Sequence, residues 1–256
     1  MIEISKCTKI YFSADGRSEV KALDNIDLTV HDKEFVALLG PSGCGKTTLM
    51  KIIAGLIPWT GGEVKINGKA LNGPGPDRAV VFQDFALMPW ADIKTNIGFG
   101  LELQGVSKEE REKKAKDLID AVGLAGFEDS YPKHLSGGMQ QRVGLARALA
   151  VNPETLLMDE PFGALDAQTR RLMQEDLLRL HEREPKTVLF VTHGMDEAIR
   201  LADRIVLMTA RPGQIKETID VPFGRPRPDN FERERAFSDL SDYLWRKLKA
   251  MQVRPE

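Results

Sequence analysis

The sequence predicts an α/β protein built around a mainly parallel sheet, with an antiparallel β-subdomain and an inserted α-helical subdomain. Two β-prone stretches come first, at residues 2–12 and 20–30, and the second alternates apolar and polar side chains as half-buried antiparallel strands do. Short, continuous apolar runs follow further along the chain, which is typical of strands buried on both faces of a parallel sheet. Between about 84 and 152 the apolar spacing changes to three and four, which indicates helices.

Composition narrows the class of molecule. At 256 residues the chain is long enough for one large domain or two small ones. Its 36 basic and 38 acidic residues give a net charge of −2, and 42% of the residues are hydrophobic, which is ordinary for a globular protein. These values argue against general disorder and against a broad nucleic-acid surface, which requires a strongly basic domain, so no nucleic-acid partner is expected.

The cysteines and the first residues bear on the compartment. Cys7 and Cys44 are far apart and lack metal-ligand spacing, so neither a disulfide framework nor a zinc site is expected. The first residues lack the basic and apolar regions of a secretory signal, and no run approaches the ~18 apolar residues of a membrane span. We therefore expect a cytosolic chain that reaches a membrane only through a partner.

The first parallel strand is expected at residues 35–39. A glycine-rich loop and a helix from Lys46 to about Ala54 follow it, in the strand, loop and helix order that opens a parallel α/β unit. Two later apolar runs, 155–158 and 187–191, end in polar residues, as buried strands do when their carboxyl ends carry chemistry.

The helical insertion is expected to contain a helix that begins after Ser107, with Glu110 completing a capping box. Its opposite face carries Glu and Lys four residues apart, which indicates either a solvated surface or a docking site. Its apolar residues follow the spacing i, i+3, i+4 and i+7: Ala115, Leu118, Ile119 and Val122.

The last part of the chain predicts a main domain at 1–222 and a short helical extension at 223–256. A strand is expected at 214–221, and the glycine and prolines of 224–228 break regular structure. This final helix packs on the domain or binds a partner, and the sequence leaves both open. Its apolar stripe consists of Phe237, Leu240, Leu244, Leu248 and Met251.

The most specific motif is a phosphate-binding loop, which lies after an expected strand and before an expected helix, the context that the motif requires. Backbone N–H groups of such a loop surround phosphate oxygens, Lys46 reaches the β and γ phosphates, and the Thr47 hydroxyl ligates Mg²⁺. A simple glycine turn is the alternative. The expected nucleotide-binding residues are Gly40, Pro41, Ser42, Gly43, Cys44, Gly45, Lys46, Thr47 and Thr48.

Two acidic residues end the apolar run at 155–158. Adjacent residues on a strand point to opposite sides, so Asp159 and Glu160 need not share a role. We assign Asp159 to the magnesium shell and Glu160 to the attacking water, as its base or its positioning group. Without the phosphate loop, the two carboxylates would equally suit a helix cap or a surface pair.

A second glycine-rich segment precedes a helix expected to run to about Ala150. Ser136 is a good N-cap, and the two glycines after it leave backbone N–H groups exposed, so a second anion site is expected. One copy of a phosphate-loop protein has no evident use for two such sites. The segment resembles the signature motif of the ATP-binding cassette (ABC) ATPases, carried here by Leu135, Ser136, Gly137, Gly138, Met139 and Gln140.

This resemblance implies a P-loop NTPase core of the RecA-like type and a head-to-tail dimer. In that family each signature motif closes on the ATP that the phosphate loop of the other subunit holds. The ligands implied are ATP and Mg²⁺. The resemblance covers residues 1 to about 222.

Other residues resemble the remaining family motifs in chain order. Gln83 resembles the Q-loop glutamine, and Asp166 resembles the acidic residue of the D-loop at 163–166. His193 resembles the switch histidine, which in that family contacts the γ-phosphate. Tyr11 resembles the aromatic residue that stacks on adenine, although the neighbouring Phe12 leaves a one-residue ambiguity. The implied catalytic residues are Glu160, His193 and Gln83, and the implied magnesium ligands are Thr47, Gln83 and Asp159.

Two departures from the family pattern are small. Gly163 and Gly194 stand where Ser and Asp are common, and both leave the implied site groups intact. Glycine is also acceptable as an N-cap at position 194. Hydrolysis therefore remains the expected activity.

The resemblance implies the motor subunit of a bacterial ABC importer, bound at the cytoplasmic face of the membrane. Its implied partners are a second copy of the same or a similar ATPase, separate permease subunits and, indirectly, an extracytoplasmic solute-binding protein. Residues 85–90 either dock a permease helix or pack inside the helical insertion. Non-transport ABC ATPases typically have two cassettes, a long coiled coil or zinc-binding cysteines, and a P-loop kinase or GTPase would leave the signature segment unexplained.

Short matches outside the catalytic motifs bear on the solute. The segments 87–90 and 210–215, with the prolines and arginines of 222–227, resemble the nitrate, sulfonate and taurine group of importer ATPases. This resemblance implies import of a small oxyanion or organosulfonate. Import of a pyrimidine, a thiamine precursor or another small organic nutrient is the alternative.

Overall fold

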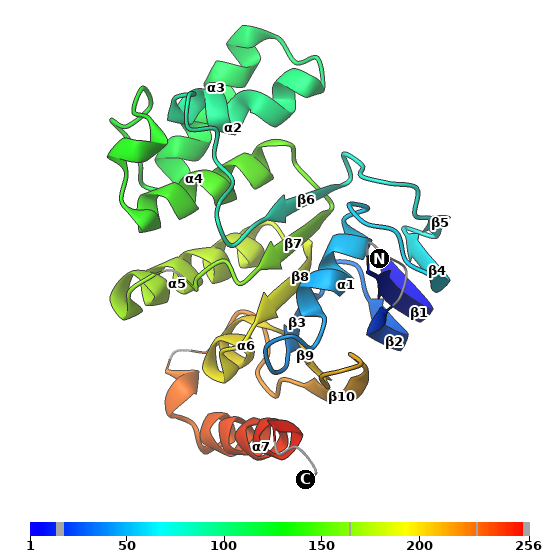
Figure 1. Ribbon diagram of the computed structural model, residues 1–256. Helices are drawn as coiled ribbons and strands as arrows, with labels where there is room; N and C mark the ends of the chain where they lie inside the picture. Colours follow the sequence, from blue (N-terminus) through cyan, green and yellow to red (C-terminus); the bar gives the residue numbers. More distant parts are fainter. Residues whose placement is uncertain (14–17, 164, 229, 253–256) are drawn as a thin grey trace. The chain divides into compact units, whose positions relative to one another are not determined.

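The computed structural model describes residues 1–13, 18–163, 165–228 and 230–252. The chain forms two compact units, one made of Met1–Gly75 with Leu177–Glu256 and the other of Pro76–Asp176. Figure 1 labels their elements. Over the described residues, no helix is long and apolar enough to cross a membrane.

The first unit contains an antiparallel sheet of order β2-β1-β4-β5. Ile4 pairs with Leu28 on one neighbouring strand and with Val64 on the other, and all three side chains are buried. The predicted alternation of the second strand is confirmed, because every second residue from Ile26 to Val30 is buried. The bounds are β1 Ile2–Phe12, β2 Glu19–Val30, β4 Gly61–Ile66 and β5 Lys69–Ala70.

The same unit contains a mainly parallel sheet in which β3 (Phe35–Leu39) pairs with β8 (Thr187–Thr192) and β9 (Arg204–Met208). The strand β10 (Ile215–Asp220) pairs with β9 in the antiparallel sense. β3 and β8 are buried along their whole length, as their continuous apolar runs predict. The helices are α1 Lys46–Ile53, α6 Met195–Leu201 and α7 Arg235–Gln252, with a 3₁₀ turn η2 at Phe231–Arg233.

The second unit combines two parallel strands with a helical part. β6 (Arg78–Val81) pairs with β7 (Thr155–Asp159), and β7 is buried throughout. The long helix α5 (Ala167–Arg183) begins in this unit and ends in the first. The remaining helices are α2 Ile93–Leu103, α3 Lys108–Ala121, α4 Gly137–Ala150 and the 3₁₀ turn η1 Pro132–His134.

The helical part has its own apolar core. Ser107 Oγ accepts the N–H of Glu110 at 3.4 Å, which is one of the two bonds of the predicted capping box, and its hydroxyl donates to the Glu110 carboxylate at 2.9 Å. Ala115 and Ile119 of α3 are buried against α2 and α4, so the predicted apolar face is confirmed. The α/β class is confirmed as well, whereas the predicted boundaries at 84, 152 and 222 remain predictions.

Candidate nucleotide-binding and hydrolysis site

The phosphate loop connects β3 to α1 in the first unit. Lys46 begins α1, and the N-cap residue is Gly45, which has a φ of 92° and no side chain with which to cap the helix. Gly43 also has a positive φ, 76°, a conformation that favours glycine. A helix N-terminus without a side-chain cap, preceded by such a loop, is well suited to bind phosphate oxygens.

The ammonium group of Lys46 lies inside the loop. Lys46 is buried, and its Nζ donates to the carbonyl oxygens of Gly40 at 2.7 Å and Pro41 at 3.2 Å. The Sγ atom of Cys44 lies 3.7 Å from the same Nζ. A buried cation surrounded by loop backbone supplies the charge that a polyphosphate requires, so these residues fit the phosphates of ATP.

The turn between β9 and β10 packs directly against the phosphate loop. A Cβ atom built at Gly213 would lie 2.1 Å from the carbonyl oxygen of Cys44. The Gly213 N–H donates to the carbonyl oxygen of Ala22 at 3.0 Å, and the Gly213 carbonyl accepts the N–H of Asp24 at 3.0 Å. Only glycine allows this approach, so the 210–215 segment supports the loop, a role that sequence analysis missed.

Tyr11 lies near the end of β1 and is 42% exposed. Lys9, two residues earlier and therefore on the same face, has its Nζ 4.8 Å from the centroid of the Tyr11 ring. Phe12 is 65% exposed and, as the next residue along the strand, points to the opposite face. The two aromatic rings therefore cannot serve one nucleotide site together, and adenine stacking by Tyr11 remains a prediction.

The Gln83 side chain lies near Gly163, in the turn of the second unit that begins at Glu160. β7 ends at the buried Asp159, and Glu160 follows with a φ of 44°, which is uncommon for a residue with a side chain. The Gly163 N–H donates to the Glu160 carbonyl at 3.0 Å. A Cβ atom built at Gly163 would lie 3.8 Å from Gln83 Nε2 and 4.0 Å from Glu160 Cβ.

The signature segment forms the start of α4. Ser136 is the N-cap, and its Oγ accepts the N–H of Met139 at 3.3 Å, as expected. Ser136 and Gly137 are exposed, whereas Leu135 is buried in the helical core. Gln140 Nε2 donates to the Leu135 carbonyl at 3.2 Å and so ties the segment to the helix.

Asp166 caps the start of α5. Its carboxylate accepts the N–H groups of Thr169 at 3.0 Å and Gln168 at 3.1 Å, and the bond from Thr169 is the main cause that lowers the pKa of Asp166. Thr169 also lies against the signature segment, because a Cβ atom built at Gly138 would lie 2.8 Å from Thr169 Cγ2. Sequence analysis missed this link between the D-loop and the signature motif. Ala164, also in the D-loop, lies outside the described residues.

Arg147, near the end of α4, is a second residue that sequence analysis missed. Its guanidinium donates to the carbonyl oxygens of Phe85 at 2.6 Å and Ala86 at 2.7 Å. Both of these residues have positive φ angles, 55° and 45°. The backbone immediately after Gln83 is therefore held in a rare conformation by the helix that begins at the signature motif.

His193 directly follows the buried strand β8, and Gly194 is the N-cap of α6. The Gly194 N–H donates to Thr192 Oγ1 at 2.9 Å, and the Thr192 hydroxyl donates to the Glu197 carboxylate. The peptide that carries His193 is therefore bonded to α6 on both sides. The contact of His193 with a γ-phosphate remains a prediction.

The candidate residues divide between the two units. The loop 40–48, Tyr11 and His193 belong to the first unit, and the other predicted site residues belong to the second. In the described part of the chain, no three His, Cys, Asp or Glu side chains group closely enough to hold a metal ion. Mg²⁺ bound to nucleotide takes few protein ligands besides phosphate and water. The hydroxyl, amide and carboxylate oxygens of Thr47, Gln83 and Asp159 are ligands of the type it prefers.

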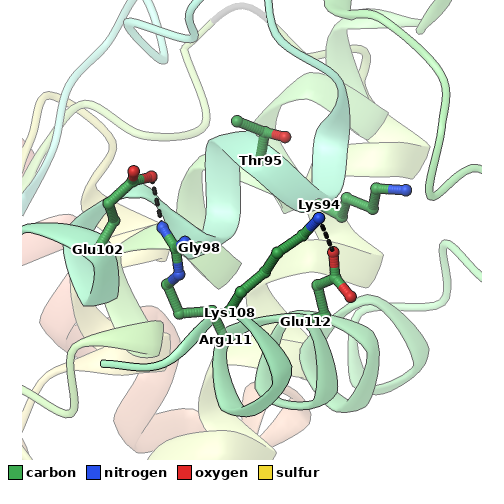
Figure 2. Close-up of a pocket in the computed structure, with 7 residues that line it drawn as sticks. All are labelled: Lys94, Thr95, Gly98, Glu102, Lys108, Arg111 and Glu112. Carbon is green, nitrogen blue, oxygen red and sulfur yellow. Dashed lines mark ion pairs between the residues drawn. The ribbon is translucent and has the colours of Figure 1, made fainter. Parts of the chain in front are cut away.

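A hollow of about 110 Å³ lies between α2 and α3 in the second unit (Figure 2). Its cations are already paired, with Arg111 2.5 Å from Glu102 and Lys108 3.8 Å from Glu112. None of the predicted site residues lines it, so we assign it no role in nucleotide chemistry. The lining residues are Lys94, Thr95, Gly98, Glu102, Lys108, Arg111 and Glu112.

Comparison with known proteins finds a family and several similar chains. The family model of the ABC transporter matches residues 23–163. An uncharacterised ABC transporter ATP-binding protein of Methanocaldococcus jannaschii is 57% identical over 253 residues, which cover 97% of this chain and 94% of the relative.

Two further relatives have assigned roles. The nitrate import ATP-binding protein of Synechocystis sp. is 43% identical, over 95% of this chain and 93% of its own. The taurine import ATP-binding protein of Pseudomonas syringae pv. tomato is 51% identical, over 79% and 78%.

Among solved structures, a dimeric ATP-binding cassette in a post-hydrolysis state, bound to ADP and Pi, superposes with a TM-score of 0.78. It is 35% identical and covers 86% of this chain and 99% of its own. The likeness therefore extends over nearly the whole of that cassette.

Proposed function

We propose that this chain, which belongs to the ABC transporter family and is an ATP-hydrolysing transport ATPase, drives the import of a small solute through a separate permease. The observation that carries the proposal is a pair of anion cradles in one chain. One is the phosphate loop around the buried Lys46, and the other is the exposed Ser136 at the start of α4. Two cradles are useful when two copies of the chain pair head to tail and each completes the site of the other.

In the proposed mechanism, Lys46 and the N–H groups at the start of α1 bind the β and γ phosphates. Glu160 accepts a proton from the attacking water or orients it, and His193 contacts the γ-phosphate. When bound, Mg²⁺ neutralises phosphate charge, and Thr47, Gln83 and Asp159 would hold it. Ser136, Gly137 and Gly138 of the second copy stabilise the charge that develops on the transferred phosphoryl group.

ATP binding closes the proposed dimer and hydrolysis reopens it. The two nucleotide states drive transport only if the permease binds the closed and open forms with different affinities. The Gln83 side chain lies near the turn at Glu160, so a change at the γ-phosphate would reach the segment that follows Gln83. That segment is the proposed route from hydrolysis to the permease.

Within residues 85–90, the exposure of one side chain favours a docking role. Leu87 packs against the helical core, as the packing alternative expects, and Phe85 is buried. Trp90 is different, because it is 77% exposed. We therefore propose Trp90 as the main apolar contact with a permease helix.

We propose nitrate, taurine or a related sulfonate as the solute, because two relatives over most of the chain are named for nitrate and taurine import. Import of another small organic nutrient is the second candidate. The proposed location is the cytoplasmic face of the membrane, with a solute-binding protein on the opposite side. A second copy of this chain, or a similar ATPase, completes the motor.

The first experiment tests the transport role. The tagged full chain is purified from its native cells in mild detergent, and the proteins that accompany it are identified by mass spectrometry. Recovery of a polytopic membrane protein supports the proposal, and uptake of labelled nitrate, taurine and alkanesulfonates by that complex then identifies the solute. Recovery of ribosomal, DNA-repair or chromosome proteins, without a membrane protein, would overturn the transport role and leave the ATPase unaffected.

The second experiment tests the hydrolytic residue. Glu160→Gln should bind ATP with wild-type affinity and lose about 10²- to 10⁴-fold in turnover, because it removes the proton acceptor. Glu109→Gln, the same change at an exposed position of α3, is the matched control. Turnover near the wild-type rate in Glu160→Gln would reject its role.

A mixing experiment tests the shared sites. Lys46→Ala and Ser136→Ala proteins are each assayed alone and then combined. If the signature acts on the other copy, one of the two sites in a mixed dimer retains every group, and hydrolysis partly recovers. If activity stays at the level of the single variants, the proposal that the signature motif of one copy acts on the ATP of the other copy is wrong.

A further inference from the structure

The C-terminal extension is built into the first unit by an aromatic cluster and two arginines. Phe223, Phe231 and Phe237 are buried, and their ring centroids lie 5.1 Å, 6.0 Å and 6.4 Å apart in the three pairs. α7 lies beside α6 (Figure 1), and the two helices pack against each other. The extension therefore has a fixed attachment to the short helix that follows His193.

Two arginines of the extension bind the C-terminal end of α6. Arg225 Nη2 donates to the carbonyl oxygen of Leu201 at 2.5 Å, and Arg227 Nε donates to that of Arg200 at 3.2 Å. Arg227 Nη2 also donates to the Ala202 carbonyl. The last carbonyl groups of a helix have no N–H partner within the helix, and they carry partial negative charge. Cations at this position therefore stabilise the end of the helix.

Arg227 remains charged near neutral pH while it does this. Burial, with a smaller contribution from the neighbouring Arg225 cation, lowers the pKa of Arg227 to about 10. Arg225 has a counter-charge in Asp203, whose Oδ1 accepts from Arg225 Nε at 2.5 Å. The other carboxylate oxygen of Asp203 accepts the N–H of Phe35 at 2.8 Å, at the start of β3. The arginine pair thus joins α6 to the parallel sheet.

The N-terminal end of α6 is held as well. Ser241 Oγ in α7 donates to Asp196 Oδ1 in the first turn of α6 at 2.9 Å. In the same α7, Tyr243 donates to Glu217 of β10 at 2.5 Å, and Lys247 lies 2.8 Å from that carboxylate. α6 is therefore attached at both ends to an extension that is itself anchored on the sheet.

The position of α6 determines the position of the peptide that carries His193. Gly194 is the N-cap of α6, and its carbonyl accepts the first helical bond, from Ala198 at 3.0 Å. On the other side of His193, the Thr192 hydroxyl bonds to Glu197 of the same helix. A shift of α6 would move both neighbours of His193.

We infer that the extension braces α6 so that His193 is positioned for hydrolysis, with Arg225, Arg227 and Ser241 as positioning residues. The inference rests on the proposed role of His193 at the γ-phosphate. It assigns the extension an internal role in turnover in place of the binding of a partner. Since a misplacement of about 1 Å costs up to about 100-fold in rate, loosening the brace should lower kcat.

The test uses two substitutions in the full chain, each with a matched control. Ser241→Ala should lower kcat about threefold and Arg227→Gln about tenfold or more, while the KM for ATP stays within about twofold, because the phosphate loop is untouched. Ser238→Ala is the first control, since Ser238 Oγ donates to the Arg235 carbonyl of its own helix at 2.9 Å, and it should retain wild-type kcat. Arg233→Gln, at an exposed position of η2, is the second control.

A double-substitution cycle separates positioning from a general loss of structure. In a His193→Ala background, Ser241→Ala and Arg227→Gln should cause no further loss, because the group that they position is gone. Thermal unfolding identifies any variant that is not folded, and Ser241→Ala decides the outcome if Arg227→Gln does not fold.

Three results would overturn the inference. If His193→Ala is slow and the folded brace variants keep wild-type kcat, the brace is wrong and the proposed function stands. If the brace variants lose equally in both backgrounds, they act independently of His193. If His193→Ala hydrolyses ATP at the wild-type rate, the proposed role of His193 fails, and the brace fails with it.

Discussion

Replacing Arg147 by alanine should lower both the stability of the chain and its rate of ATP hydrolysis. The side chain reaches from α4 to the backbone of Phe85 and Ala86, which have φ angles of 55° and 45°. Residues with side chains adopt such angles at a cost of about 1–3 kcal/mol each, and only when their surroundings hold them. Without the guanidinium, this segment should relax and carry Gln83 away from the turn at Glu160.

The magnitude follows from the two hydrogen bonds. At 2.6 Å and 2.7 Å from its acceptors, the guanidinium makes charge-assisted bonds, each worth about 1.5–3 kcal/mol. Relief of the backbone strain returns part of this free energy. We expect Arg147→Ala to lower the free energy of unfolding by about 2–4 kcal/mol and kcat on the order of tenfold or more. The stability and kcat of Arg147→Lys should lie between those of Arg147→Ala and the wild type, because one ammonium group does not reproduce the planar fork of a guanidinium.

Urea unfolding followed by circular dichroism measures the stability, and phosphate release at saturating ATP measures kcat. Arg183→Ala, at an exposed position at the end of α5, is the control for loss of an arginine. Unfolding at the wild-type urea concentration together with a wild-type kcat would refute the reasoning. A loss of stability without a loss of kcat in folded protein would reject only the link to Gln83.

Three further predictions concern the phosphate loop, the adenine site and a buried histidine. Gly213→Ala should raise the Kd for ATP on the order of tenfold, because its Cβ would lie 2.1 Å from the Cys44 carbonyl oxygen; Gly224→Ala, with no described atom within 4 Å of its Cβ, is the control in a titration with a fluorescent ATP analogue. Tyr11→Ala should weaken ATP binding by the ~1–3 kcal/mol of a base–aromatic stack and Phe12→Ala should not, and the reverse result in calorimetry would assign adenine to Phe12. Burial is the main cause that lowers the pKa of His181, and the Arg225 cation adds to it, whereas Nε2 bonds the Lys186 carbonyl at 2.9 Å and the buried Nδ1 has no hydrogen-bond partner among the described residues. Below the unfolded pKa of 6.5 the unfolded chain therefore binds a proton that the folded chain does not, so the free energy of unfolding should fall by up to about 1.4 kcal/mol per pH unit, and His181→Gln should flatten that slope in melts from pH 7 to pH 5.

Local pattern predicted the elements whose burial repeats along the chain. The continuous apolar runs at 35–39, 155–158 and 187–191 became β3, β7 and β8 within one residue of the expected bounds. Ser136 and Ser107 became N-caps because capping depends on the next three residues alone. The apolar stripe predicted for the final helix also contains the buried residues Phe237 and Leu244.

Other elements carry too little local signal. β4 has only Val64 and Ile66 buried, and its first residues are glycines, so no alternation could be read there. α6 is seven residues long, which is less than the window over which helical periodicity is measured. The helix α5 is mostly polar, and tertiary packing of Met173 and Leu177 provides its buried face.

The chain's own order of residues determined the phosphate loop, the signature segment and the acidic pair, because each lies on a few consecutive residues whose chemistry depends on local backbone geometry. Tertiary structure alone decided which distant residues support them. Arg147 reaches carbonyl groups 61 and 62 positions earlier, and Arg225 bonds a carbonyl 24 positions earlier. Such contacts join residues whose proximity arises only when the core packs, so no spacing along the sequence contains them.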